Sequence, residues 1–127
     1  MAHDAKTYAE CGTAIRKIFD SGEDFDITDH IPSIRAAKMD LFSIIHELTV
    51  PRRSRTTSQL AERVSRALKD LNPTVEYYTF EKVVLDLADV LVTLSKLEGG
   101  LKSTQESKVV EAKLFCEHMK HEMSEPE

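Results

Sequence analysis

The sequence of 127 residues contains only two cysteines, Cys11 and Cys116, which stand near its opposite ends. It has no apolar run approaching the roughly 18 residues of a membrane span, because charges interrupt the most apolar segment, residues 79–98. Its first residues also lack the basic and then apolar order of a secretory signal. We therefore expect a cytoplasmic protein without membrane contact. Its thiols should be reduced and packed as small hydrophobic side chains, with a disulfide or a reactive thiol as the alternative.

Proline and glycine are scarce, with four of each, and most of them stand where helices should begin or end. Pro32 suits the first turn of a helix, whereas Pro51 and Pro73 follow helix ends. Gly99 and Gly100 stop another helix. The few breakers therefore divide the chain into helical segments joined by short connections.

Five amphipathic segments are predicted as helices, over about residues 4–21, 33–49, 57–72, 79–98 and from 103 onward. The third should begin at the cap residues Thr57 and Ser58, and the fifth at a capping box that joins Ser103 and Glu106. Residues 74–80 have a strand-like composition but are too isolated to build a sheet. The sequence thus predicts an all-α antiparallel bundle of about five helices in one domain, residues 1–122, followed by an acidic tail, residues 123–127.

Four of these segments carry a single apolar stripe at helical spacing, which should form the core. The expected core residues are Tyr8, Cys11, Ile15, Ile18, Phe19, Ile34, Ala37, Leu41, Ile44, Ile45, Leu48, Leu60, Ala61, Val64, Ala67, Leu68, Leu71, Val109, Ala112, Cys116, Met119 and Met123.

The remaining segment, residues 79–98, is apolar around most of its circumference and is expected to be the central helix. Its polar residues fall on one narrow strip, formed by Lys82, Asp86, Asp89, Thr93 and Lys96. So much apolar surface must be covered either by the bundle or by a second subunit, so a homodimer is expected. The strip is either the one solvated edge of this helix or the wall of a polar cleft.

The phrase "VVLDLADVLVTLSKL" resembles the second motif helix of the MazG-like all-α nucleoside triphosphate pyrophosphohydrolases. The resemblance covers about residues 57–98. In that family a Glu-x-x-Glu pair on one helix and an acidic pair on a later helix bind magnesium, which orients the triphosphate and the attacking water. By position, the resemblance assigns Gln59 and Glu62 to the first pair, and Asp86 and Asp89 to the second.

Two features depart from the family pattern. Gln59 supplies an amide where the family has a carboxylate, and both Gln59 and Glu62 point more than about 130° away from the apolar face of their helix. We therefore expect no cofactor and no catalytic residue. Magnesium would be bound by Glu62, Asp86 and Asp89 only if the chain shares the activity of the family.

Charge is unevenly distributed in a chain of net charge −5. Five of the seven arginines lie between residues 52 and 66, namely Arg52, Arg53, Arg55, Arg63 and Arg66. Residues 20–29 are acidic and contain no basic residue. Such blocks are often only solvated, but clustered guanidinium groups suit an acidic protein surface, or the acidic block of another copy. Nucleic acid is less favoured, because no aromatic residue interleaves with the arginines.

No cysteine or serine has a local context for nucleophilic catalysis, and His118, His121 and Glu122 are expected on the surface and not around a metal. The chain is thus interpreted as a small non-enzymatic helical-bundle protein that regulates or inhibits a macromolecular partner through protein–protein interaction, with the five arginines as its partner-binding residues. The alternatives are a MazG-like magnesium-dependent pyrophosphohydrolase and a small nucleic-acid-associated factor.

Overall fold

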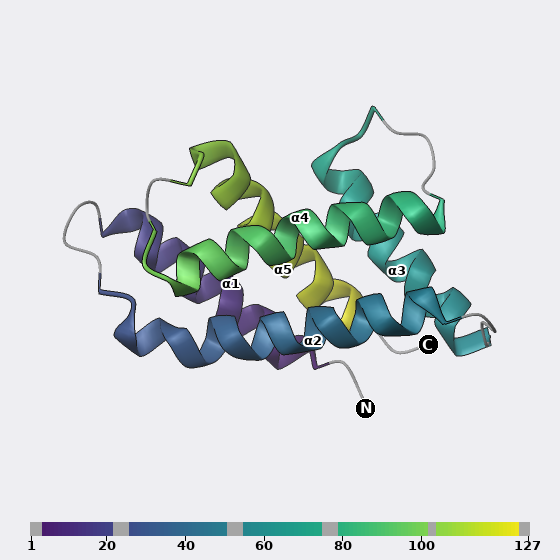
Figure 1. Cartoon of the computed structure of the whole chain (residues 1–127), viewed down its shortest axis with the longest axis horizontal. Helices are drawn as coiled ribbons and strands as arrows, with labels where there is room; N and C mark the ends of the chain where they lie inside the picture. The colour runs from purple at the N-terminus through teal and green to yellow at the C-terminus, as the bar shows by residue number, and fades with distance from the viewer. Residues whose placement is uncertain (1–3, 22–25, 51–54, 75–78, 102–103, 125–127) are drawn as a thin grey trace.

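The computed structural model describes residues 4–21, 26–50, 55–74, 79–101 and 104–124 (Figure 1). Its helices are α1 (Ala5–Asp20), α2 (Ile31–Thr49), α3 (Arg55–Leu71), α4 (Phe80–Glu98) and α5 (Glu106–Ser124), with a short 3-10 turn, η2 (Thr28–His30), before α2. These ranges contain no strand, and the prediction of an all-α bundle of five helices is confirmed. Arg52, Arg53, Ser103, most of the 74–80 segment and the last three residues of the acidic tail lie outside the described residues.

Local hydrogen bonds explain where several helices begin and end. The side chain of Asp4 accepts a hydrogen bond from the backbone N–H of Lys6 at 2.9 Å, and Thr79 caps α4 by accepting from the N–H of Lys82 at 3.1 Å. At the other end of α4, Gly100 has a φ of 79°, a left-handed conformation that favours glycine, and its N–H donates to the carbonyl of Leu97.

Two helices begin two residues before their approximate predicted starts. The third helix begins at Arg55 and not at Thr57, because the Thr57 side chain is turned inward and buried inside the first turns of α3. The second helix begins at Ile31 and not at Ser33, since Pro32 occupies a first-turn position, where its missing N–H costs nothing.

The helices form two groups that enclose the core. In Figure 1, α2 and α4 lie side by side in front, and α1 and α5 lie behind them. The most extensive helix–helix contact joins α1 to α5, while α3 packs mainly against α5. Helix α4 contacts α2 on one side and α3 and α5 on the other, which leaves one of its faces toward solvent. Among the helices that the structure describes, none has both the length and the apolarity of a membrane span.

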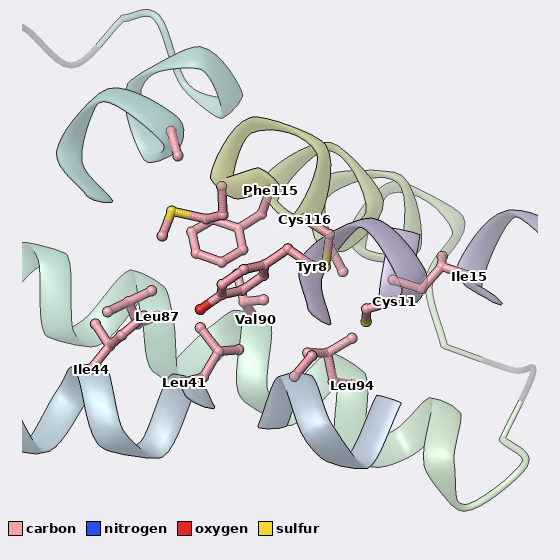
Figure 2. Close-up of a cluster of buried hydrophobic side chains, with 14 of the residues drawn as sticks. Tyr8, Cys11, Ile15, Leu41, Ile44, Leu87, Val90, Leu94, Phe115 and Cys116 are labelled. Atoms are coloured by element: carbon pink, nitrogen blue, oxygen red, sulfur yellow. The ribbon is translucent and has the colours of Figure 1, made fainter. Parts of the chain in front are cut away.

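The core is a continuous apolar cluster to which all five helices contribute, and Figure 2 shows its central part. Tyr8 and Phe115 meet edge to face, with ring centroids 6.3 Å apart, between α1 and α5. Most of the expected core residues are buried, but Phe19 is 40% exposed near the end of α1. Phe115 is fully buried although it was missed, because it lies beside the apolar stripe expected for its helix and not on it.

Ion pairs fasten the end of α4 to the beginning of α2. Arg35 Nε lies 2.6 Å from Glu98 Oε2, and Lys38 donates a hydrogen bond to the other oxygen of the same carboxylate. The hydrogen bonds from Lys38 and then from Arg35 lower the pKa of Glu98. Because the partners are some 60 residues apart in sequence, these contacts fix how α2 and α4 lie against each other.

Candidate functional site

Both aspartates of α4 line a polar cleft between α3, α4 and α5 whose volume is about 220 Å³. Its polar wall residues are Asn72, Lys82, Asp86, Asp89, Thr93, Lys108 and Glu111. Asp86 and Asp89 of the polar strip therefore form part of the wall of a polar cleft and not a solvated edge. Thr93 of the same strip is buried. Its hydroxyl donates a hydrogen bond to the backbone carbonyl of Asp89 at 3.1 Å, so this buried polar group has a partner within its own helix.

The charges in the cleft largely offset one another. Lys82 Nζ lies 3.1 Å from Asp86 Oδ1, and Lys108 Nζ lies 3.3 Å from Glu111 Oε2. Within the described ranges, Asp89 has no ion-pair partner. Ion pairs as exposed as these contribute about 0–1 kcal/mol, so they could exchange for a polar ligand at little cost. The cleft therefore suits weak binding of a polar group better than binding of a group that carries several charges.

The positions that the MazG-like resemblance assigns to magnesium do not converge. Glu62 is exposed on the outer side of α3 and does not line the cleft with Asp86 and Asp89. Gln59 has no carboxylate to offer, and the ammonium group of Lys82 already neutralises Asp86. In the part of the chain that the structure describes, no three His, Cys, Asp or Glu side chains are arranged to hold a metal ion. These residues do not fit the four-ligand magnesium set of the family.

The predicted arginine surface is brought together only in part. Arg55 is exposed at the first residue of α3, and Arg63 is half-buried in the middle of that helix. Arg66 Nη1 lies 3.2 Å from Glu122 Oε2 of α5, although its side chain remains 56% exposed. The described arginines therefore extend from the first residue of α3 to the edge where α3 meets α5.

A contact between a histidine and a carboxylate joins the same two helices. His118 Nδ1 of α5 lies 3.3 Å from Asp70 Oδ2 of α3, one turn along from the pair between Arg66 and Glu122. The histidine and the glutamate that sequence reasoning placed on the surface thus help to dock α5 onto α3. The sequence contained a signal for these two contacts. Each helix carries a basic and an acidic residue four positions apart, Arg66 and Asp70 on α3 and His118 and Glu122 on α5. The basic residue of one helix meets the acidic residue of the other when the helices run antiparallel.

Large apolar side chains gather on the outward faces of α2 and α4. Met39 and Phe42 of α2 are 66% and 55% exposed, and Leu85 and Val92 of α4 are 57% and 52% exposed. We call these four residues, on two helices that lie side by side, the α2–α4 apolar face (Figure 1). Sequence reasoning expected excess apolar surface on α4, but it missed Met39 and Phe42, whose only signal was their position off the apolar stripe of α2.

The two cysteines are free, fully buried and adjacent, as Figure 2 shows for the pair between α1 and α5. A hydrogen bond between Cys11 and Cys116 and burial both raise the pKa of the Cys116 thiol, which keeps it protonated and unreactive. Burial, and secondly the charge of Asp40, raise the pKa of Tyr8. The expectation of reduced thiols packed as small hydrophobic side chains agrees with this arrangement.

Comparisons of the chain with models of protein families, with curated proteins and with solved structures find no match. Three features of the described residues bear on the function of the chain. They are the polar cleft, the arginines of α3 and the α2–α4 apolar face.

Proposed function

We propose that this chain is a non-enzymatic helical-bundle protein that regulates or inhibits a macromolecular partner through protein–protein contact. The observation that carries the proposal is the α2–α4 apolar face, in which four large side chains on adjacent helices are each more than half exposed. Single exposed apolar residues are normal on soluble proteins, whereas contiguous apolar patches rimmed by charge usually mark interaction sites. A surface of this kind suits binding by burial and does not by itself supply catalytic groups.

The arginines of α3 supply a second surface, suited to a partner with an acidic surface. Arg55 and Arg66 expose planar guanidinium groups that can pair with carboxylates through two hydrogen bonds. The existing contact of Arg66 with Glu122 is no obstacle, because an exposed ion pair of this kind contributes less than about 1 kcal/mol. Charged groups at the edge of an interface mainly speed encounter, while apolar groups at its centre provide affinity.

A cytoplasmic location and self-association are parts of the same proposal. Two free thiols that touch inside the core suit a reducing compartment. Self-association would cover the apolar face whenever no other partner does so.

Affinity capture from a cell extract tests the proposal. The wild-type chain is immobilised beside a variant with Phe42→Glu and Leu85→Glu, and beside a control, Val110→Glu, which changes an exposed apolar residue of α5. We expect the wild type and the control to retain the same proteins, and the face variant to lose them. Identical retention by all three chains would contradict the proposal, provided that circular dichroism shows the same helix content in each.

A second candidate, a magnesium-dependent pyrophosphohydrolase, is favoured by one observation, which is that Asp86 and Asp89 share a cleft. The test is release of pyrophosphate from nucleoside triphosphates in the presence of magnesium, compared with an Asp89→Asn variant. Release by the wild type that the variant abolishes would support this candidate over the binding protein. From the position of Glu62 we expect no release.

A further inference from the structure

We infer that the α2–α4 apolar face binds a second copy of this chain, with the two α4 helices antiparallel across a twofold axis near Ala88. The inference rests on the proposed function, because it names an occupant for the same face. Its basis is the order of residues along the outward side of α4 and the charges at the two ends of that side.

The outward side of α4 carries a seam with alternating steps of four and three residues. It runs through Glu81, Leu85, Ala88, Val92 and Ser95, which lie within about 80° of one another around the helix. This spacing is that of the a and d positions in a coiled coil, where helices pack against each other along a narrow stripe. Along this seam all but the half-buried Ala88 are exposed, so no other helix of the described chain covers it.

The seam is complementary to itself only when reversed. Leu85 lies three residues before Ala88 and Val92 lies four after it, so a twofold axis at this point brings Leu85 of one copy close to Val92 of the other. Glu81 and Lys96 stand seven residues before and eight after the same point, which brings opposite charges together at both ends of the contact. A parallel pair would instead place like charges against each other.

Both charged groups are available for this contact. Glu81 and Lys96 are exposed, and within the described ranges neither takes part in an ion pair. At the centre, the small side chain of Ala88 allows the two helix backbones to approach closely. The apolar middle and the charged ends therefore match the core and the rim of a protein–protein interface.

A stable interface also needs area, which explains the part played by α2. Stable complexes bury about 800 Å² on each partner, more than the stripe of one helix provides. Two helices of 19 residues, each about 28 Å long and packed about 9 Å apart, present a flat face of about 500 Å² before the relief of side chains is counted. Met39 and Phe42 extend the apolar surface onto α2, so the contact that we infer uses both helices.

A residue on the twofold axis faces its own copy, and this gives a direct test. An Ala88→Cys variant, treated with oxidised glutathione, should form a disulfide between two chains and run as a dimer on a non-reducing gel. The wild type supplies a blank, because Cys11 and Cys116 are fully buried. A matched control, Ser107→Cys, places an equally new thiol at an exposed position of α5 and should give at least tenfold less cross-linked dimer.

Charge reversal tests the antiparallel order. Glu81→Lys or Lys96→Glu alone should weaken the dimer about tenfold, because two ion pairs become two repulsive contacts, and the double variant should restore it to within about threefold. Sedimentation equilibrium measures all four chains. In a parallel dimer the double variant would show no rescue, so an absence of rescue would overturn the inference.

The outcomes also separate this inference from the proposed function. Stable interfaces of standard size have Kd values between micromolar and picomolar, so a wild-type chain that sediments as a monomer at about 100 µM would overturn the second copy as occupant. If the Phe42→Glu and Leu85→Glu variant nevertheless lost a captured protein, the face would belong to a different partner and the proposed function would stand. If the chain dimerises but captures nothing, the dimer stands and the proposed regulation of a partner fails.

Discussion

The α1–α5 pair and the α2–α4 pair enclose the same core, but their outward faces differ. Apart from Phe19, which is 40% exposed near the end of α1, the exposed residues of α1 are polar, and among the exposed residues of α5 the only large apolar one is Val110, at 38%. The α2–α4 pair instead exposes four large apolar side chains, each by more than half. One side of the molecule therefore exposes mainly polar residues to water, whereas the other exposes large apolar side chains that we propose another protein covers.

The inner contacts of the two pairs differ in a complementary way. The α1–α5 contact is the most extensive between helices, with Gly12 of α1 lying against Cys116 of α5 and with Tyr8 and Phe115 packed edge to face. The α2–α4 pair is instead held at one end by the ion pairs of Glu98. The first pair is thus held by packing within the core, and the second combines a share of the core with an exposed apolar face, which we propose as a surface for binding.

The largest expected difference lies between two leucines of α4 that are two residues apart. Leu87 is fully buried and Leu85 is 57% exposed. Leu87→Ala should lower the free energy of unfolding by about 2–5 kcal/mol, through lost burial and the cavity that it leaves. Leu85→Ala should change it by less than about 0.5 kcal/mol at low protein concentration, where no dimer forms. Urea denaturation measures both, and equal losses would show that the outward face is part of the core.

The α1–α5 contact can be probed at Gly12. A Cβ atom there would lie 3.6 Å from the Cβ of Cys116, an ordinary van der Waals distance. Gly12→Ala should therefore raise stability by about 0.5–1 kcal/mol through its better helix propensity. Gly12→Leu should lower stability by about 1–3 kcal/mol, because the longer side chain overpacks the contact. Thr13→Leu, at the next and exposed position, is the control and should have little effect.

The ion pairs of Glu98 predict that the stability gained from the contact between α2 and α4 depends on pH. Since folding lowers the pKa of Glu98 below its ordinary value of 4.5, the stability that it contributes is present above pH 4.5 and is lost as pH falls through the folded pKa. Glu98→Gln should cost about 1 kcal/mol at neutral pH, and this deficit should shrink in acid. Thermal unfolding from pH 7 to pH 3 measures it. Lys38→Met, which removes the larger cause, should reproduce much of the change, and a deficit that persists unchanged at pH 3 would contradict the assignment.

Much of the bundle could be predicted from the sequence, because amphipathic spacing and a few well-placed breakers mark each helix. Helix starts were less accurate, since Thr57 looks like a cap but is buried by tertiary packing. Contacts between distant segments were not predicted. The adjacency of Cys11 and Cys116 had no local signal, and the contact between Asp70 and His118, although its order of residues is visible in the sequence, depends on how α5 lies against α3.

The candidate sites show the same limit. Helical spacing placed Asp86 and Asp89 on one strip, but only the positions of α3 and α5 could distinguish a cleft wall from a solvated edge. The excess apolar surface of α4 was predicted from its composition. Met39 and Phe42 were not, because an apolar residue off the main stripe can be either buried by a neighbouring helix or exposed, and the sequence does not say which.

Replacement of the arginines is expected to have the smallest effect on stability. It also tests whether the arginines or the α2–α4 apolar face bind the partner. Replacing all five by Ala should lower the free energy of unfolding by less than about 0.5 kcal/mol per residue, since Arg55 is exposed and the side chain of Arg66 is 56% exposed. If the arginines form the partner surface, capture of an acidic partner should fall while the dimer persists. The Phe42→Glu and Leu85→Glu variant should instead lose the dimer. A five-arginine variant that unfolds readily would show that the arginines are structural, and one that folds and captures normally would leave the α2–α4 apolar face as the binding surface.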